Sequence, residues 1–185
     1  MLRYALLIWA CAFGVQVVSA DPVRPGRWDV SVDKDPITDA KLVSLGLTSP
    51  EDTGFLMFRC ERGDIFAVIA FTGESFDRSD WFVVNYRVNE LPSSHFGAMA
   101  TGRVRGTSGV IMSRPETPKA SAIVPFLDSI FKESDDGTPD GKPVKIRIRA
   151  ESVGMTPSDL RFVAHGSRKA IRSFTTSCGF SLDTN

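Results

Sequence analysis

The sequence is poor in the residues from which catalytic and metal sites are usually built. It has two histidines, His95 and His165, and three cysteines in 185 residues. Zinc sites need histidine or cysteine ligands, and this chain has few to supply. The G-x-S-x-G motif of serine hydrolases is absent, since the nearest match, residues 106–109, is one residue short. We therefore expect no metal and no cofactor, and the sequence indicates no catalytic residue.

The chain also lacks an excess of charge of either sign. Lys+Arg and Asp+Glu both number 22. Proteins dedicated to nucleic-acid binding are usually strongly basic, so we expect no nucleic-acid partner. After the first twenty residues, no apolar run approaches the ~18 residues that a membrane span requires. The remaining chain is expected to have no membrane span, and its composition does not indicate an oligomeric state.

The one long apolar run opens the chain. The segment MLRYALLIWACAFGVQVVSA has a cationic start, an apolar middle and a small-residue end. This layout predicts a signal peptide over residues 1–20, cleaved before Asp21, and an exported protein that is periplasmic or secreted. A lipidated Cys11 is the alternative, but a bulky Trp9 stands where such signals have a small residue. Residues 21–185 then form one secreted domain.

Two cysteines, Cys60 and Cys178, remain after the predicted cleavage. In an oxidising compartment such a pair favours a disulfide bond. Cys60 is expected on the apolar face of a strand, and Cys178 at the end of the apolar stripe of a helix. A bond between them would enclose 117 intervening residues, a loop worth about 4–5 kcal/mol of stability in the chain-entropy model. Two unpaired buried thiols are the alternative.

Hydrophobic periodicity predicts a chain made mainly of strands. The predicted strands cover residues 27–32, 55–60, 65–71, 81–88, 144–150 and 160–165. Helical spacing predicts a mid-chain helix over 121–131 and a C-terminal helix over 167–178. We therefore expect an α+β domain, mainly an antiparallel, sandwich-like β-sheet with a mid-chain helix, a C-terminal helix and one disulfide.

Arginines recur opposite the apolar positions of these strands. Arg147 and Arg149, for example, alternate with isoleucines, and Arg161 joins them if strands 144–150 and 160–165 pair antiparallel. The candidate binding face comprises Arg59, Arg87, Arg147, Arg149 and Arg161. Guanidinium groups suit carboxylates and phosphates, so this face predicts docking to an acidic protein surface or a cell-envelope glycan. A solvated sheet face, balanced by acids elsewhere, is the alternative interpretation.

Three functions of different classes are compatible with these features. The first is a non-enzymatic binding or accessory module that uses the arginine face. The second is a small exported hydrolase acting on cell wall or protein, with His95, His165 or a carboxylate pair in a cleft. The third is a secreted inhibitor that presents the acidic loop 133–142. Trp28 and Trp81 are either anchors of a binding surface or core residues.

A series of short motifs also resembles a known family. They are a tryptophan strand, Asp35–Asp39, Leu56–Cys60, Tyr86–Val88, a helix ending near Phe131, Val144–Arg149 and a terminal segment through Ala170-Ile171 to Cys178-Gly179-Phe180. Their order over most of the chain resembles the VasI-like accessory proteins of type VI secretion and related exported bacterial proteins of unknown role. The resemblance implies a bacterial periplasmic β-rich domain with one bridge between Cys60 and Cys178, and no assigned chemistry.

Overall fold

A single antiparallel sheet organises the protein. The computed structural model describes residues 26–78, 80–104, 108–135 and 142–182. The predicted signal peptide and residues 136–141 of the predicted acidic loop lie outside these ranges. The strands are β1 (Asp29–Lys34), β2 (Lys41–Thr48), β3 (Gly54–Glu61), β4 (Asp64–Thr72), β5 (Trp81–Val88), β6 (Ser94–Val104), β7 (Ser108–Ser113), β8 (Val144–Glu151) and β9 (Ser158–Ala164). The helices are α1 (Ile123–Lys132) and α2 (Ser167–Cys178).

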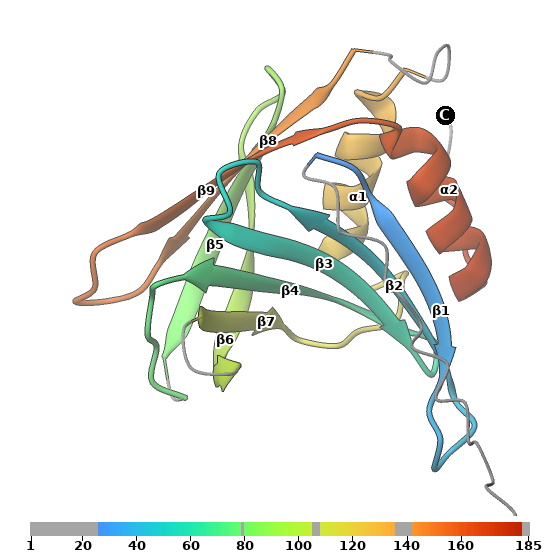
Figure 1. Ribbon diagram of the computed structural model, residues 1–185, viewed down its shortest axis with the longest axis horizontal. Coiled ribbons are helices and arrows are strands. Elements are labelled where there is room, and N and C mark those ends of the chain that lie inside the picture. The colour runs from blue at the N-terminus through green and yellow to red at the C-terminus, as the bar shows by residue number, and fades with distance from the viewer. Residues whose placement is uncertain (1–25, 79, 105–107, 136–141, 183–185) are drawn as a thin grey trace, which may run out of the picture.

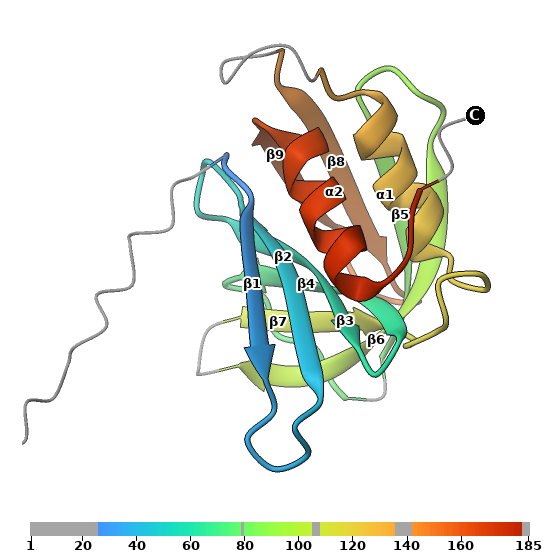
Figure 2. The ribbon, with the colours of Figure 1, turned by 90° about the vertical axis from the view of Figure 1, so that its right-hand side faces the viewer.

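The strands lie in the order β1-β2-β3-β4-β7-β6-β5-β8-β9, and each pairs antiparallel with its neighbours. The sheet curves strongly around the two helices (Figures 1 and 2). The curvature brings its two edges together, where the N–H of His165 donates to the carbonyl of Gly26 at 2.9 Å. The predicted fold class, an α+β domain that is mainly antiparallel sheet, is confirmed.

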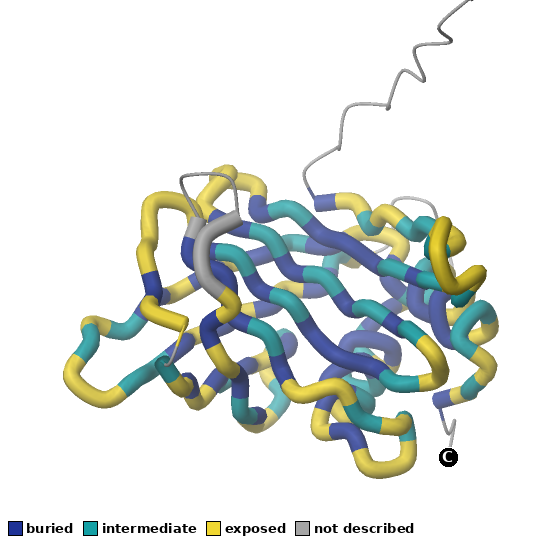
Figure 3. The backbone as a smooth tube through the Cα atoms, turned by 90° about the horizontal axis from the view of Figure 1, so that it is seen from below, coloured by how far each residue is buried: buried dark blue, intermediate teal, exposed yellow. Residues whose placement is uncertain are grey.

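The two helices fill the concave side of the sheet (Figure 2). Phe126 of α1 is fully buried, and its ring stacks on Tyr86 of β5 with a centroid distance of 4.0 Å. The same ring meets Phe58 of β3 edge-on at 5.3 Å. Ile171 and Phe174 of α2 are also buried in this core. Because the core lies on the concave side of the sheet, alternate strand residues face outward and are less buried (Figure 3).

The hairpin between β3 and β4 shows how local sequence fixes the register. Arg62 and Gly63 both have positive φ angles, 53° and 88°. A two-residue hairpin turn of this kind matches the twist of the flanking strands and needs two residues that tolerate positive φ. The turn pairs Glu61 with Asp64 and so places Cys60 opposite Ile65.

The helices agree closely with the sequence-based prediction. The predicted range of the C-terminal helix, 167–178, is that of α2. The mid-chain helix begins at Ile123, two residues later than predicted. The hydroxyl of Ser121 instead accepts a hydrogen bond from the N–H of Ile123 at 3.1 Å. Pro125 lies in the first turn, where a missing N–H costs nothing.

The structure does not support the predicted disulfide. Cys60 and Cys178 do lie side by side, 2.8 Å apart, but no disulfide bond joins them and both cysteines are free. Packing of α2 against the sheet brings the two thiols together. Burial and this contact raise the pKa of the Cys178 thiol well above its ordinary value. α2 is therefore held by packing and by hydrogen bonds such as that from Lys41 Nζ to the Ser177 carbonyl, 2.7 Å.

The two tryptophans of the described residues have different roles. Trp28 is half-buried against Phe58, and its indole N–H donates to the hydroxyl of Ser167 at 2.8 Å. It therefore packs against the core and ties the start of the described chain to α2. Trp81, at the start of β5, leaves 54% of its surface exposed on the outer face of the sheet.

Candidate anion-binding face

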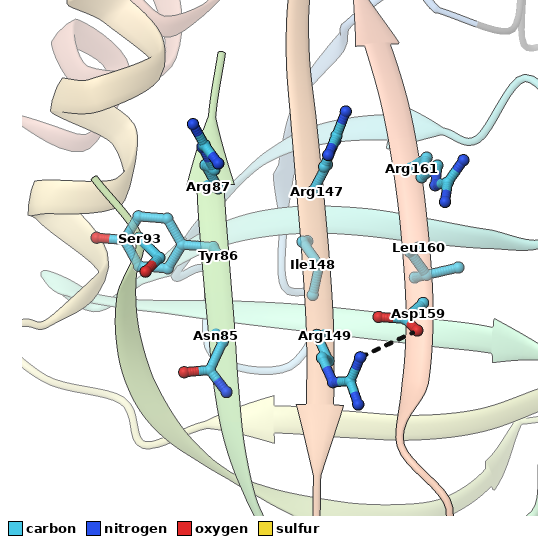
Figure 4. Close-up of a pocket in the computed structure, with 10 residues that line it drawn as sticks. All are labelled: Asn85, Tyr86, Arg87, Ser93, Arg147, Ile148, Arg149, Asp159, Leu160 and Arg161. Carbon is cyan, nitrogen blue, oxygen red and sulfur yellow. Dashed lines mark ion pairs between the residues drawn. The ribbon is translucent and has the colours of Figure 1, made fainter. Parts of the chain in front are cut away.

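Three arginines lie in one row across three adjacent strands. The register pairs Arg87 of β5 with Arg147 of β8, and Arg147 with Arg161 of β9. All three side chains are exposed on the outer face, and Figure 4 shows them side by side. We call Arg87, Arg147 and Arg161 the arginine row. The condition under which Arg161 joins this face, antiparallel pairing of strands 144–150 and 160–165, is met.

Strict alternation in the sequence produces this row. In β8 the isoleucines Ile146 and Ile148 are buried beneath the sheet, so Arg147 between them must face outward. In β5 the neighbours of Arg87 are Tyr86 and Val88, and both are buried. The Tyr86 ring is fixed by its stacking on Phe126, and burial raises the pKa of its hydroxyl. The strands that present the arginine row are therefore packed tightly against the core.

A second row crosses the same strands two residues away. Asn85 of β5, Arg149 of β8 and Asp159 of β9 are register partners. Together with Ser93, which directly precedes β6, the two rows line an open groove of about 310 Å³. Figure 4 shows the polar side chains of both rows on the same side of the three strands. The groove thus offers guanidinium, amide and hydroxyl donors to one ligand.

The two rows differ in how their charges are balanced. Arg149 Nε lies 2.7 Å from a carboxylate oxygen of Glu151, and its Nη1 lies 3.8 Å from Asp159. Arg87 pairs at 3.0 Å with Glu90, whose side chain is 94% exposed. Among the residues that the structure describes, no carboxylate lies within 4.0 Å of Arg147 or Arg161. Positive charge is therefore concentrated in the arginine row.

The fifth arginine of the predicted face lies elsewhere. Arg59 belongs to β3, which is separated from β5 by β4, β7 and β6. Its guanidinium is 3.6 Å from Glu61 and lies over the ring of Phe66, 6.0 Å from the centroid. Arg59 is therefore half-buried beside its own partners, and the structure does not bring it to the groove.

The histidines that an exported hydrolase would use are also far apart in the fold. His95 is exposed on the outer face of β6, opposite Asn85 in the register. His165 is exposed after the end of β9, at the bridge with Arg27. Within residues 26–78, 80–104, 108–135 and 142–182, no group of three or more His, Cys, Asp or Glu side chains is arranged to hold a metal ion.

Sequence reasoning missed Asn85, Ser93 and Asp159 as members of the groove. Asn85 alternates with apolar residues of the predicted strand 81–88, so the sequence predicted that it faces outward. The sequence did not predict that it lies beside Arg149. Ser93 precedes β6, a strand that the sequence did not predict. Only the register of four strands, β6, β5, β8 and β9, brings these three residues together.

No family model matches the chain, and no similar curated protein or solved structure was found. Neither described helix is long and apolar enough to cross a membrane.

Proposed function

We propose that the protein is a non-enzymatic binding module that holds a partner through the partner's anionic groups. The observation that carries this proposal is the arginine row, in which three guanidinium groups stand side by side on a rigid sheet. Like charges placed directly opposite one another on neighbouring strands destabilise a sheet. A binding function explains why three arginines occupy positions where neutral residues would give a more stable fold.

The chemistry of the row fits carboxylate, phosphate or sulfate groups. A guanidinium group presents a planar fork of N–H donors that binds two oxygens of such an anion at once. Neighbouring strands are about 4.8 Å apart, so adjacent guanidinium groups are spaced to bind neighbouring anionic groups or to share one. Since Arg147 lies between the other two arginines, it contributes to either arrangement.

The proposed setting is the cell envelope. The predicted signal peptide supports export to the periplasm or beyond. A role as an accessory protein of a type VI secretion system is supported by the sequence resemblance alone. The arginine row and the proposed binding activity do not depend on that assignment.

Titration with inorganic pyrophosphate tests the proposal. NMR signals of arginine Nε–Hε groups report directly on contact with an anion. We expect shifts concentrated on Arg87, Arg147 and Arg161, and we expect these shifts to weaken as salt is added. The variant Arg147→Gln is expected to lose most of the response, whereas the matched variant Arg59→Gln keeps it. Equal shifts on all surface arginines, or no shifts, would contradict the proposal.

A further inference from the structure

Trp81 lies on the outer face of the sheet, on the same strand as Arg87. A Cβ atom at Gly97 of β6 would lie only 2.5 Å from Cζ2 and 3.2 Å from Cη2 of this indole. The ring therefore covers the backbone at a position where only glycine leaves room for it. The Cζ2 edge of the indole rests against β6 at Gly97, and 54% of the residue remains exposed. This arrangement is a platform for a flat apolar ligand surface.

The platform and the arginine row are two ends of one continuous surface. Outward-facing residues of β5 run from Trp81 through Val83 and Asn85 to Arg87. Six residues of antiparallel strand span about 20 Å. Val83 is 42% exposed. The next outward-facing residue of β5 is Asn85, and Arg149 of β8 lies opposite it. A hollow of about 240 Å³ beside the indole is lined by both Arg114 and Glu116. An elongated ligand would meet apolar, amide and cationic groups in turn.

We infer that the ligand of this surface is a linear acidic polysaccharide. The inference rests on the proposed function and names the partner of the same arginine row. Sugar rings have an apolar face of C–H groups that stacks on an aromatic ring, while their hydroxyls bind amides. Carboxylate, phosphate or sulfate substituents on the same chain bind guanidinium groups. In this arrangement Trp81 stacks on a sugar ring, Asn85 hydrogen-bonds to sugar hydroxyls and the arginine row binds the anionic substituents.

The backbone arrangement favours a polysaccharide over an extended acidic peptide. Peptides that bind sheets usually add to an edge, where free N–H and C=O groups pair with their backbone. β5 is hydrogen-bonded to β6 and β8, and β8 to β5 and β9. Most of the surface therefore offers only side chains, which suits a ligand without a peptide backbone. The equal numbers of acidic and basic residues argue against a nucleic acid.

Binding of short galacturonic acid oligomers, measured by isothermal titration calorimetry, tests the inference. We expect Trp81→Ala to weaken this binding by roughly tenfold and to leave pyrophosphate binding at the arginine row unchanged. Trp81→Phe should retain most of the affinity because it keeps an aromatic face. Gly97→Ala removes no polar group but lifts the indole from its position, so we expect it to weaken oligomer binding as well. Ile37→Ala, which changes a residue that is 91% exposed in the β1–β2 turn, is the matched control.

The outcomes separate the inference from the proposed function. If pyrophosphate fails to bind the arginine row, the proposed function fails, and the inference fails with it. If pyrophosphate binds but the oligomers bind no more tightly, or bind independently of Trp81, only the inference is overturned. It is also overturned if an acidic peptide or a thymidine oligonucleotide binds more tightly than the oligomers through Trp81. Self-association of the protein that Trp81→Ala abolishes would assign the surface to a second copy and overturn it too.

Discussion

Replacing the central arginine of the row with glutamine should stabilise the protein. Arg147 has a like charge on both neighbouring strands, and no described carboxylate lies within 4.0 Å of it. Opposed residues of an antiparallel pair have Cβ atoms about 5 Å apart, and long side chains can separate their charges further. Two unit charges about 7 Å apart in water repel by about 0.6 kcal/mol. Arg147→Gln removes the repulsion from Arg161 in full and that from Arg87 in part, because Glu90 pairs with Arg87 at 3.0 Å, so the gain is about 0.5–1 kcal/mol at low ionic strength.

The experiment compares the unfolding free energies of the two proteins at low and at high salt concentration. The screening length is about 10 Å at 0.1 M salt and about 3 Å at 1 M. We therefore expect urea denaturation to show a higher unfolding free energy for Arg147→Gln at low salt, and nearly equal values at 1 M salt. In thermal unfolding, a gain of 1 kcal/mol raises Tm by about 2–4 °C for a domain of this size.

The matched control is Arg149→Gln, one row away on the same face of β8. This substitution removes the contacts of Arg149 with Glu151 and Asp159. Exposed ion pairs contribute about 0–1 kcal/mol, so the variant should be as stable as the parent protein or less so. If Arg147→Gln is no more stable than Arg149→Gln at low salt, or if its gain is unaffected by salt, the argument from charge repulsion is refuted.

Three further predictions concern the core, the thiols and a turn. Phe126→Ala should lower the unfolding free energy by about 3–5 kcal/mol in urea, because the ring fills the space between Phe58 and Tyr86; a loss below 1 kcal/mol would show that this site is not the centre of the core. The raised pKa of Cys178 means that above about pH 9 the unfolded state loses the thiol proton while the folded state keeps it. The unfolding free energy of the reduced protein should therefore fall as the pH rises above 9, and Cys178→Ala should reduce that fall; an equal fall in both proteins would refute the assignment. Backbone N–H groups of Ile37 and Thr38 donate to Asp35 Oδ1 at 2.8 Å and lower the pKa of this carboxyl below its ordinary 3.8, which an NMR titration checks directly, and a value at or above 3.8 would contradict this turn geometry.

Much of the fold could be predicted from periodicity, because patterns with a clear period of two or 3.6 are determined locally. β8 alternates apolar with charged residues throughout, and α2 has buried residues at helical spacing, so both were predicted with nearly their observed bounds. β2, β6 and β7 were not predicted. β6, with the sequence SHFGAMATGRV, has two glycines and few of the branched residues that favour strands. Its place in the sheet comes from pairing with β5 and β7.

The candidate site was predictable to a similar extent. Alternation in the sequence indicated which arginines face outward, and four of the five lie together on β5, β8 and β9. Alternation contains no information about which strands are neighbours, so Arg59 was grouped with them although β3 is four places from β5 in the sheet. The cysteine pair shows the same limit. The apolar patterns of β3 and α2 predicted that Cys60 and Cys178 lie close together. They contain no information about whether the two sulfur atoms are bonded.

The position of α2 means that the domain cannot complete its folding until its C-terminal helix is present. This helix is the last element of the described chain, yet it packs against β1 and β2, the first two strands. Trp28 donates to Ser167, and Lys41 donates to Ser177. After the two N-terminal strands have been made, their apolar side stays uncovered while the next 118 residues are added, because β2 ends at Thr48 and α2 begins at Ser167. Native folding of this domain is therefore completed only after synthesis of its C-terminal helix, and a chain truncated before Ser167 should accumulate as an aggregation-prone intermediate.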